Sequence, residues 1–247
     1  MSDIIINPWE RVDDLQIKNY RIIQDTRGFC FGMDAVLLSG YASLKKKSKV
    51  MDLCSGTGII PILLEAKYDI SKIDGLEYQK DYVHMANRSV AMNDQEDKIK
   101  IFSGDVREVR QTFSADSYDY VTCNPPYMTG EHGLTNDSYS KAISRHEILC
   151  TIDDVIAAAK WLLKPSGHLI MVHRPFRMAE IIYKLKENKL EPKRMRLVYP
   201  YIDKEPNMIL IDAVKGGKQR VTVDPPFIVY NKDGSYTEEI YKVYGKL

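Results

Sequence analysis

The feature that most constrains the fold of this chain is a regular alternation of short apolar runs with helical stretches. The first run, residues 49–53 (KVMDL), ends at a turn with two glycines, and residues 58–66 (GIIPILLEA) have the composition of a helix. Strands that alternate with helices predict right-handed β-α-β units and a parallel sheet. The further predicted strands are 72–77, 99–102, 118–123 and 168–173, and the further predicted helices are 79–92, 153–163 and 176–188.

Two β-rich runs near the end of the chain, 195–199 and 208–214, are predicted to form an antiparallel pair at one edge. The first 45 residues resemble an appended cap, with an alternating segment and an apolar helix at 34–44. We therefore predict an α/β fold with a seven-stranded, mostly parallel sheet. The cap, residues 1–45, is expected to belong to the same domain as residues 46–247.

Composition excludes several classes of protein. The chain has 247 residues and 44% hydrophobic residues, and no apolar run is long enough to span a membrane. The N-terminus lacks the basic and apolar regions of a secretion signal. The four cysteines, at positions 30, 54, 123 and 150, form no CxxC pair and have no zinc-like spacing. A reduced, cytoplasmic protein without a structural metal is the expectation, and we expect a monomer.

The net charge of +1 gives no support for nucleic-acid binding, but the charge is unevenly distributed. Residues 174–196 contain eight basic and three acidic side chains, and a further basic segment follows at 215–220. These segments either form an RNA-binding face or are solvated helix and strand surfaces. Charge counts leave both interpretations open.

The turn after the first strand, Asp52-Leu-Cys-Ser-Gly-Thr-Gly58, lies where an open α/β sheet binds its ligand. Two glycines let the backbone turn sharply and approach a ligand closely. The cofactor-binding residues predicted in this turn are Asp52, Cys54, Gly56 and Gly58. A GxG turn alone is weak support, because it recurs in many tight connections.

Acidic residues at the next two strand ends strengthen that prediction. Glu77 can accept hydrogen bonds from both hydroxyls of a ribose, and Asp105, with Val106 beside it, can accept one from the amine of an adenine. Either acid alone could be a solvated strand end or a helix cap. Because the turn lacks the third small residue of the dinucleotide fingerprint, S-adenosylmethionine is favoured over a nicotinamide cofactor.

The fourth strand ends in Asn124-Pro125-Pro126-Tyr127. The Asn124 side-chain oxygen and the Pro125 carbonyl can accept both N–H bonds of a planar amine, which frees its lone pair for attack. Consecutive prolines fix the backbone, and Tyr127 offers a flat face for stacking. We predict Asn124, Pro125, Pro126 and Tyr127 as the catalytic residues, with Asn124 also touching the cofactor. The alternative is a structural Pro-Pro turn with a core tyrosine.

These motifs (DLCSGTG, GLEYQ, SGDV and VTCNPPY) resemble those of class I S-adenosylmethionine-dependent methyltransferases with a Rossmann-like fold. Further similarity, in FGMDAVLL (31–38), SRHE (144–147) and KPSGH (164–168), points to the bacterial tRNA adenine N6-methyltransferases that act on an anticodon-loop adenine of valine tRNA. The resemblance implies N6-methylation of an adenine in RNA. Release-factor glutamine methyltransferases and rRNA guanine N2-methyltransferases use a similar motif and remain alternatives. A DNA adenine methyltransferase and a non-catalytic RNA-binding module are less favoured.

Three features outside these motifs carry weaker expectations. Asp34, in the cap helix, is placed to approach the methionine end of the cofactor. The polar segment 128–140 is either a lid that orders on substrate binding or an inert loop. His146 is assigned to a helix start or to the surface, because the reaction needs no strong general base.

Overall fold

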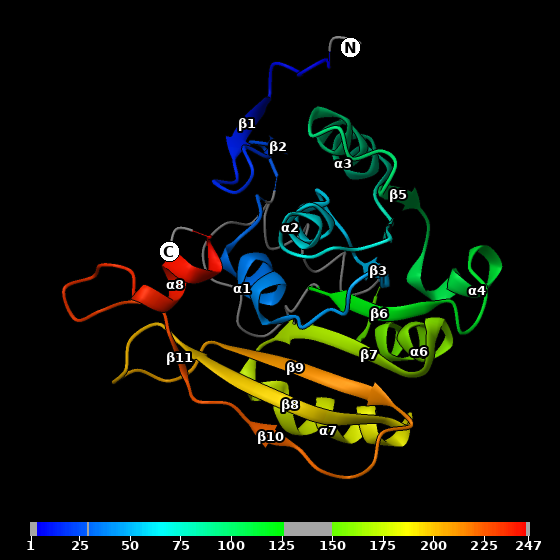
Figure 1. Ribbon diagram of the computed structural model, residues 1–247, viewed down its shortest axis with the longest axis vertical. Coiled ribbons are helices and arrows are strands. Elements are labelled where there is room, and N and C mark those ends of the chain that lie inside the picture. The colour runs from blue at the N-terminus through cyan, green and yellow to red at the C-terminus, as the bar shows by residue number, and fades with distance from the viewer. Residues whose placement is uncertain (1–3, 29, 126–149, 246–247) are drawn as a thin grey trace.

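The computed structural model describes residues 4–28, 30–125 and 150–245. In this part of the chain the central sheet has nine strands in the order β10-β8-β9-β7-β6-β3-β4-β5, and β11 also pairs with β8 (Figure 1). The predicted seven-stranded sheet is confirmed, and two strands of two residues each extend it. The strands are β3 (Lys49–Leu53), β4 (Lys72–Glu77), β5 (Ile99–Ser103), β6 (Tyr118–Cys123), β7 (Leu163–His173), β8 (Leu190–Tyr199), β9 (Met208–Lys215), β10 (Thr222–Val223) and β11 (Phe227–Ile228).

Strands β5, β4, β3, β6 and β7 are parallel to one another, and β9 is antiparallel to both β7 and β8. The predicted antiparallel pair is therefore confirmed. Strand β7 begins five residues earlier than predicted, because the segment 164–167 continues the strand through an irregularity opposite β6. Ser166 has a φ of 63°, so the segment still turns locally although it does not leave the sheet.

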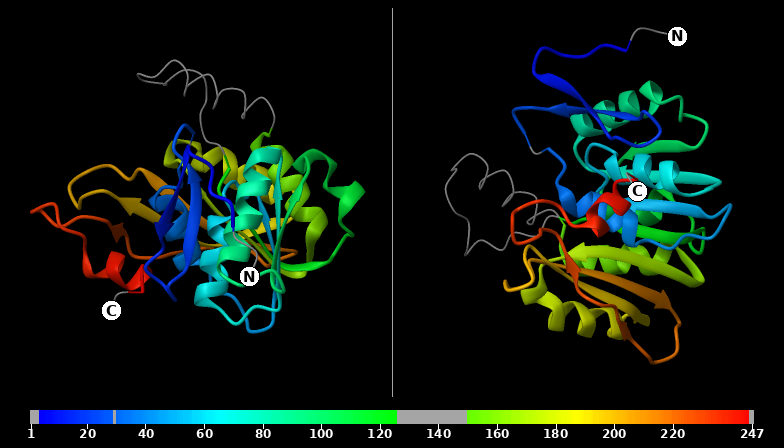
Figure 2. Two further views of the ribbon diagram at one scale, coloured as in Figure 1. Left: turned by 90° about the horizontal axis from the view of Figure 1, so that it is seen from above. Right: turned by 60° about the vertical axis from the view of Figure 1, so that its left-hand side comes forward.

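Helices cover both faces of the sheet (Figures 1 and 2). Successive strand residues point to opposite faces, so Val50 packs with one set of helices and Met51 with the other. Among the described residues, no helix is both long enough and apolar enough to cross a membrane. One face carries α1 (Met33–Tyr41), α2 (Ile59–Lys67), α3 (Lys80–Met92) and α8 (Glu238–Val243); the other carries α4 (Val109–Thr112), α6 (Ile152–Leu162) and α7 (Met178–Glu187). Two 3₁₀ turns, η1 (Val106–Glu108) and η2 (Pro175–Arg177), precede α4 and α7.

The segment predicted as a cap contains a hairpin and helix α1. Strands β1 (Glu10–Asp14) and β2 (Arg21–Asp25) pair antiparallel and lie beside α3 at one end of the molecule (Figure 1). The hairpin is fastened by an ion pair of 2.5 Å between Glu10 and Arg88 of α3. This hydrogen-bonded partner lowers the pKa of Glu10 to about 2.

Candidate active site

The predicted site residues that the structure describes converge because four parallel strands end together. Leu53 pairs with both Leu76 and Cys123, and Glu77 pairs with Ser103. The segments that follow β3, β4, β5 and β6 consequently emerge at one edge of the sheet. This edge is the carboxyl edge, where ligands bind in folds of this class.

The loop after β3 takes an unusual backbone conformation. Cys54, Gly56 and Gly58 have φ values of 57°, 51° and 78°, in the left-handed region that favours glycine. A Cβ placed on Gly56 would meet nothing within 4 Å, so open space lies beside the loop. The Gly56 N–H donates to Glu77 Oε2 over 2.9 Å, which ties the loop to the end of β4.

Glu77 ends β4, is 7% exposed and is hydrogen-bonded to the glycine loop; its role as a ribose ligand stays a prediction. Its Oε1 accepts the N–H of Gln79 and its Oε2 that of Gly56, each over 2.9 Å. A carboxylate oxygen has two lone pairs, so each oxygen retains one acceptor position for a hydroxyl. The open space and the fixed carboxylate fit the nucleoside part of S-adenosylmethionine.

Asp52 lies beneath the loop and is fully buried. Its two oxygens accept hydrogen bonds from Ser55 Oγ over 2.7 Å and from Thr122 Oγ1 over 2.6 Å. Burial raises the pKa of Asp52 to about 7, against the opposing effect of these two hydroxyls. The observed contacts of Asp52 therefore join the glycine loop to the end of β6.

Asp105 follows β5, and its carboxylate is engaged by a neighbour. Arg107 donates to Asp105 Oδ2 over 2.5 Å and to Oδ1 over 3.0 Å, and it lowers the pKa of Asp105. An adenine amine would have to share this carboxylate with the guanidinium. Val106 is 7% exposed and begins η1, so its side chain belongs largely to the core.

Asn124 directly follows β6 and contacts the first turn of α1. Its Nδ2 donates to Asp34 Oδ2 over 3.0 Å, a contact between residues 90 positions apart. Pro125 beside it is buried. Pro126, Tyr127, the segment 128–140 and His146 lie outside the described residues.

Three cysteines gather next to the loop. Cys54 Sγ lies 3.8 Å from Cys150 Sγ, while Cys123 is completely buried at the end of β6. Burial raises the pKa of Cys123, so the thiol stays protonated at neutral pH. Over the residues that the structure describes, no group of three or more His, Cys, Asp or Glu side chains is arranged to hold a metal ion.

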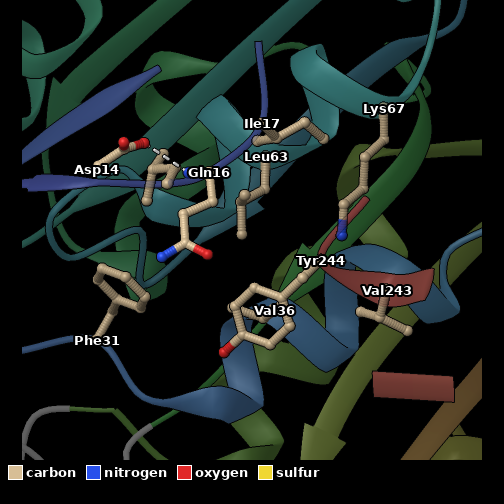
Figure 3. A pocket seen from close by; sticks show the side chains of 10 residues that line it. Asp14, Gln16, Ile17, Phe31, Val36, Leu63, Lys67, Val243 and Tyr244 are labelled. Carbon is tan, nitrogen blue, oxygen red and sulfur yellow. Dashed lines mark hydrogen bonds between the residues drawn. The ribbon is translucent and has the colours of Figure 1, made fainter. Parts of the chain in front are cut away.

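A separate hollow lies between the turn of the β1–β2 hairpin and helices α1, α2 and α8 (Figure 3). It is a cavity of about 60 Å³. Lys67, the last residue of α2, projects into it and donates to Ser39 Oγ over 2.8 Å. Burial lowers the pKa of Lys67 to about 8. The sequence did not predict the partial burial of Lys67, because a lysine in the last turn of a helix is the usual arrangement and normally faces solvent.

The basic segment 174–196 does not form a single charged face. Arg194 and Arg196 lie on β8, whereas Arg177 and Lys184 belong to η2 and α7 on the other face of the sheet. Acidic partners neutralise most of these side chains. The ion pairs are Arg177–Glu180, Lys184–Asp153, Lys186–Glu191, Arg194–Asp224 and Arg196–Glu239.

The second basic segment, 215–220, lies away from the strand ends that form the site. Lys215 contacts Asp116 and the carbonyl of Leu163, which lie just before β6 and at the start of β7. These contacts place it at the amino edge of the sheet, opposite the glycine loop. Lys215 therefore lies at the opposite edge of the sheet from the glycine loop, and an RNA-binding role of the two basic segments stays a prediction.

Comparison with known proteins agrees with this geometry. The tRNA1(Val) (adenine(37)-N6)-methyltransferase of Parabacteroides distasonis is 26% identical over 198 residues, or 80% of this chain and 81% of the relative. The enzyme of the same name from Aeromonas hydrophila is 23% identical and covers 90% and 91% of the two chains.

Solved structures share the fold at low identity. A predicted O-methyltransferase from Agrobacterium tumefaciens superposes with a TM-score of 0.71 at 20% identity, and it covers 87% of this chain and 96% of its own. The model of the methyltransferase small domain matches residues 34–191, from the first turn of α1 to the second residue of β8. The chain therefore belongs to the methyltransferase small domain family.

Proposed function

We propose that this protein transfers a methyl group from S-adenosylmethionine to the exocyclic N6 amine of an unpaired adenine in a tRNA anticodon loop. The observation that carries the proposal is the position of Asn124 and Pro125. They follow β6 directly, at the same edge of the sheet as the glycine loop. The Asn124 side-chain amide donates a hydrogen bond to Asp34. The names of the curated relatives support the choice of a tRNA adenine.

Residues of the chain have separate roles in this proposal. Glu77 accepts hydrogen bonds from the ribose hydroxyls, and the glycine loop leaves room for the rest of the nucleoside. Asp52 stabilises the glycine loop by accepting a hydrogen bond from the Ser55 hydroxyl. S-adenosylmethionine, when bound, supplies an electrophilic methyl group on sulfur.

Asn124 Oδ1 and the Pro125 carbonyl accept the two N–H bonds of the target amine. These two acceptors hold the amine in line with the methyl group and oppose delocalisation of its lone pair into the ring. The methylated amine then loses its extra proton, which needs no strong base. An adenine in a loop suits such a site because it can leave its stack at small cost.

A test of the substrate uses purified protein, methyl-labelled S-adenosylmethionine and four separate pools: unmodified tRNA, rRNA, DNA and release factor. The label should appear in N6-methyladenosine from the tRNA pool. Label in methylglutamine or in N2-methylguanosine would refute the adenine substrate and keep the chemistry. Label in no pool would count against methyl transfer to any of these polymers.

Asn124→Ala provides the test of the motif. It should bind S-adenosylmethionine with near wild-type affinity, measured by isothermal titration calorimetry, and lose most turnover. The loss of one catalytic acceptor of this kind costs about 10²–10³-fold in kcat. A variant that methylates at the wild-type rate would contradict the assigned role of Asn124.

A further inference from the structure

The contact between α1 and the reaction motif has a defined hydrogen-bonding direction. Asp34 Oδ2 accepts from Asn124 Nδ2 over 3.0 Å, and Asp34 Oδ1 accepts the N–H of Ala35 over 2.9 Å. The carboxylate is thus fixed by its own helix and turned toward the residue that follows β6. Nothing in the local sequence around either residue specifies this pairing, since 90 positions separate them.

An ionised carboxylate accepts hydrogen bonds and donates none, whereas a carboxamide has one donating end and one accepting end. Only the NH₂ end of Asn124 can therefore face Asp34, and the Oδ1 end is turned away from it. A target amine is itself a donor, so it requires Oδ1. If the Asn124 carboxamide rotated by 180°, its NH₂ group would face the NH₂ group of the target amine. The hydrogen bond to the substrate would then be lost.

We propose that Asp34 is a positioning residue that fixes the carboxamide of Asn124 with its oxygen toward the target amine. This inference rests on the proposed methyl transfer to an amine. The hydrogen bond to a charged acceptor also polarises the carboxamide, which strengthens Oδ1 as an acceptor. The residue acts through Asn124 and needs no contact with the substrate.

The backbone around Asp34 leaves room for its carboxylate in this position. A Cβ on Gly32 would come within 2.9 Å of Asp34 Oδ1. The φ of Gly32 is −106°, which any residue can adopt, so Gly32→Ala would strain no backbone angle. This substitution should displace the carboxylate while keeping its charge.

A purely structural role for Asp34 is the main alternative, because an acidic residue in the first turn stabilises a helix through its dipole. Asp153 gives a matched control. It also lies in the first turn of a helix, α6, and it pairs with Lys184 at the surface. Asp153→Ala removes the same charge from an equivalent helix position without touching Asn124.

The first experiment measures turnover and cofactor affinity together. Asp34→Ala should lower kcat by about 10- to 100-fold, the range expected for one charge-assisted hydrogen bond. The Kd for S-adenosylmethionine should stay within about twofold of wild type, because in this proposal Asp34 orients Asn124 and does not contact the methionine end of the cofactor. Asp34→Asn keeps an acceptor oxygen and should fall between wild type and Asp34→Ala. In an Asn124→Ala background, Asp34→Ala should lower turnover no further.

A second experiment needs no substrate, so it separates failure of this inference from failure of the proposed function. The side-chain NH₂ resonances of Asn124 are identified in ¹⁵N-labelled protein by their loss in Asn124→Ala. They should shift in Asp34→Ala and Gly32→Ala and stay in place in Asp153→Ala. Unshifted resonances in Asp34→Ala, a weakened Kd with unchanged kcat, or equal losses of kcat in Asp34→Ala and Asp153→Ala would each overturn the inference.

Discussion

Replacement of Lys67 by methionine should stabilise the protein. Lys67 extends from the end of α2 into the cavity shown in Figure 3, where its amine contacts the hydroxyl of Ser39. Partial burial lowers the pKa of the amine from 10.5 to about 8, so the folded protein still carries a half-buried ammonium at pH 7. Methionine has a similar length and no charge to desolvate.

The expected magnitude follows from the pKa shift. A lowering of 2.5 pKa units corresponds to about 3 kcal/mol, and loss of the hydrogen bond to Ser39 subtracts about 1 kcal/mol. Lys67→Met should therefore raise the free energy of unfolding by about 2 kcal/mol at pH 7. Lys46→Met is the matched control, since Lys46 is exposed and its replacement should change stability by less than about 0.5 kcal/mol.

The pH dependence gives the sharper test. The folded-state pKa of Lys67 lies below the unfolded value, so the destabilisation by the buried charge is complete below pH 8 and disappears as pH rises to 10.5. Urea unfolding at pH 7 should therefore show a gain for Lys67→Met, and unfolding at pH 10.5 should show no gain, because only the lost hydrogen bond to Ser39 remains there. A gain of equal size at both pH values, or none at pH 7, would refute the reasoning.

Three other substitutions test the site and its supports. Glu77→Ala should weaken S-adenosylmethionine binding by about 10- to 100-fold in calorimetry, because a charged acceptor is lost; an unchanged Kd would remove Glu77 from the site. Gly75→Ala should lower the free energy of unfolding by about 1–3 kcal/mol, since its Cβ would come within 2.7 Å of Ser55 Oγ. The pKa of Glu10 lies below its unfolded value, so its pairing with Arg88 stabilises the hairpin above about pH 4.5 and is lost toward pH 2. Hydrogen-exchange protection factors, which account for the slower intrinsic exchange in acid, should accordingly fall in the hairpin at pH 3 in the wild type and fall less in Glu10→Gln.

The sequence predicted the sheet well because the information is local. A strand such as Tyr118–Cys123 and a helix such as Ile152–Leu162 show their periodicity within a few residues. The hairpin strand Glu10–Asp14 was missed, because its polar residues do not alternate with apolar ones. The two-residue strands beside β8 were also missed, since they have too few residues for any pattern.

The arrangement of the candidate site could be predicted for the same reason. Residues at the ends of neighbouring parallel strands meet at one edge, so the glycine loop, Glu77 and Asn124 could be brought together from their positions alone. Their individual contacts could not. The cofactor role assigned to Asp52 did not anticipate a buried carboxylate that bonds Ser55 and Thr122.

The sequence by itself determined the order of strands and helices along the chain. It also determined that the candidate site lies at the carboxyl edge of the sheet, and which residue types form that site. Only the tertiary structure decided which side chains meet across the fold. The contact of Asp34 with Asn124, the burial of Lys67 and the neutralisation of the basic segment by acids such as Glu239 all join distant parts of the chain. Periodicity specifies which face of an element is buried, whereas partners across the fold depend on how separate elements pack.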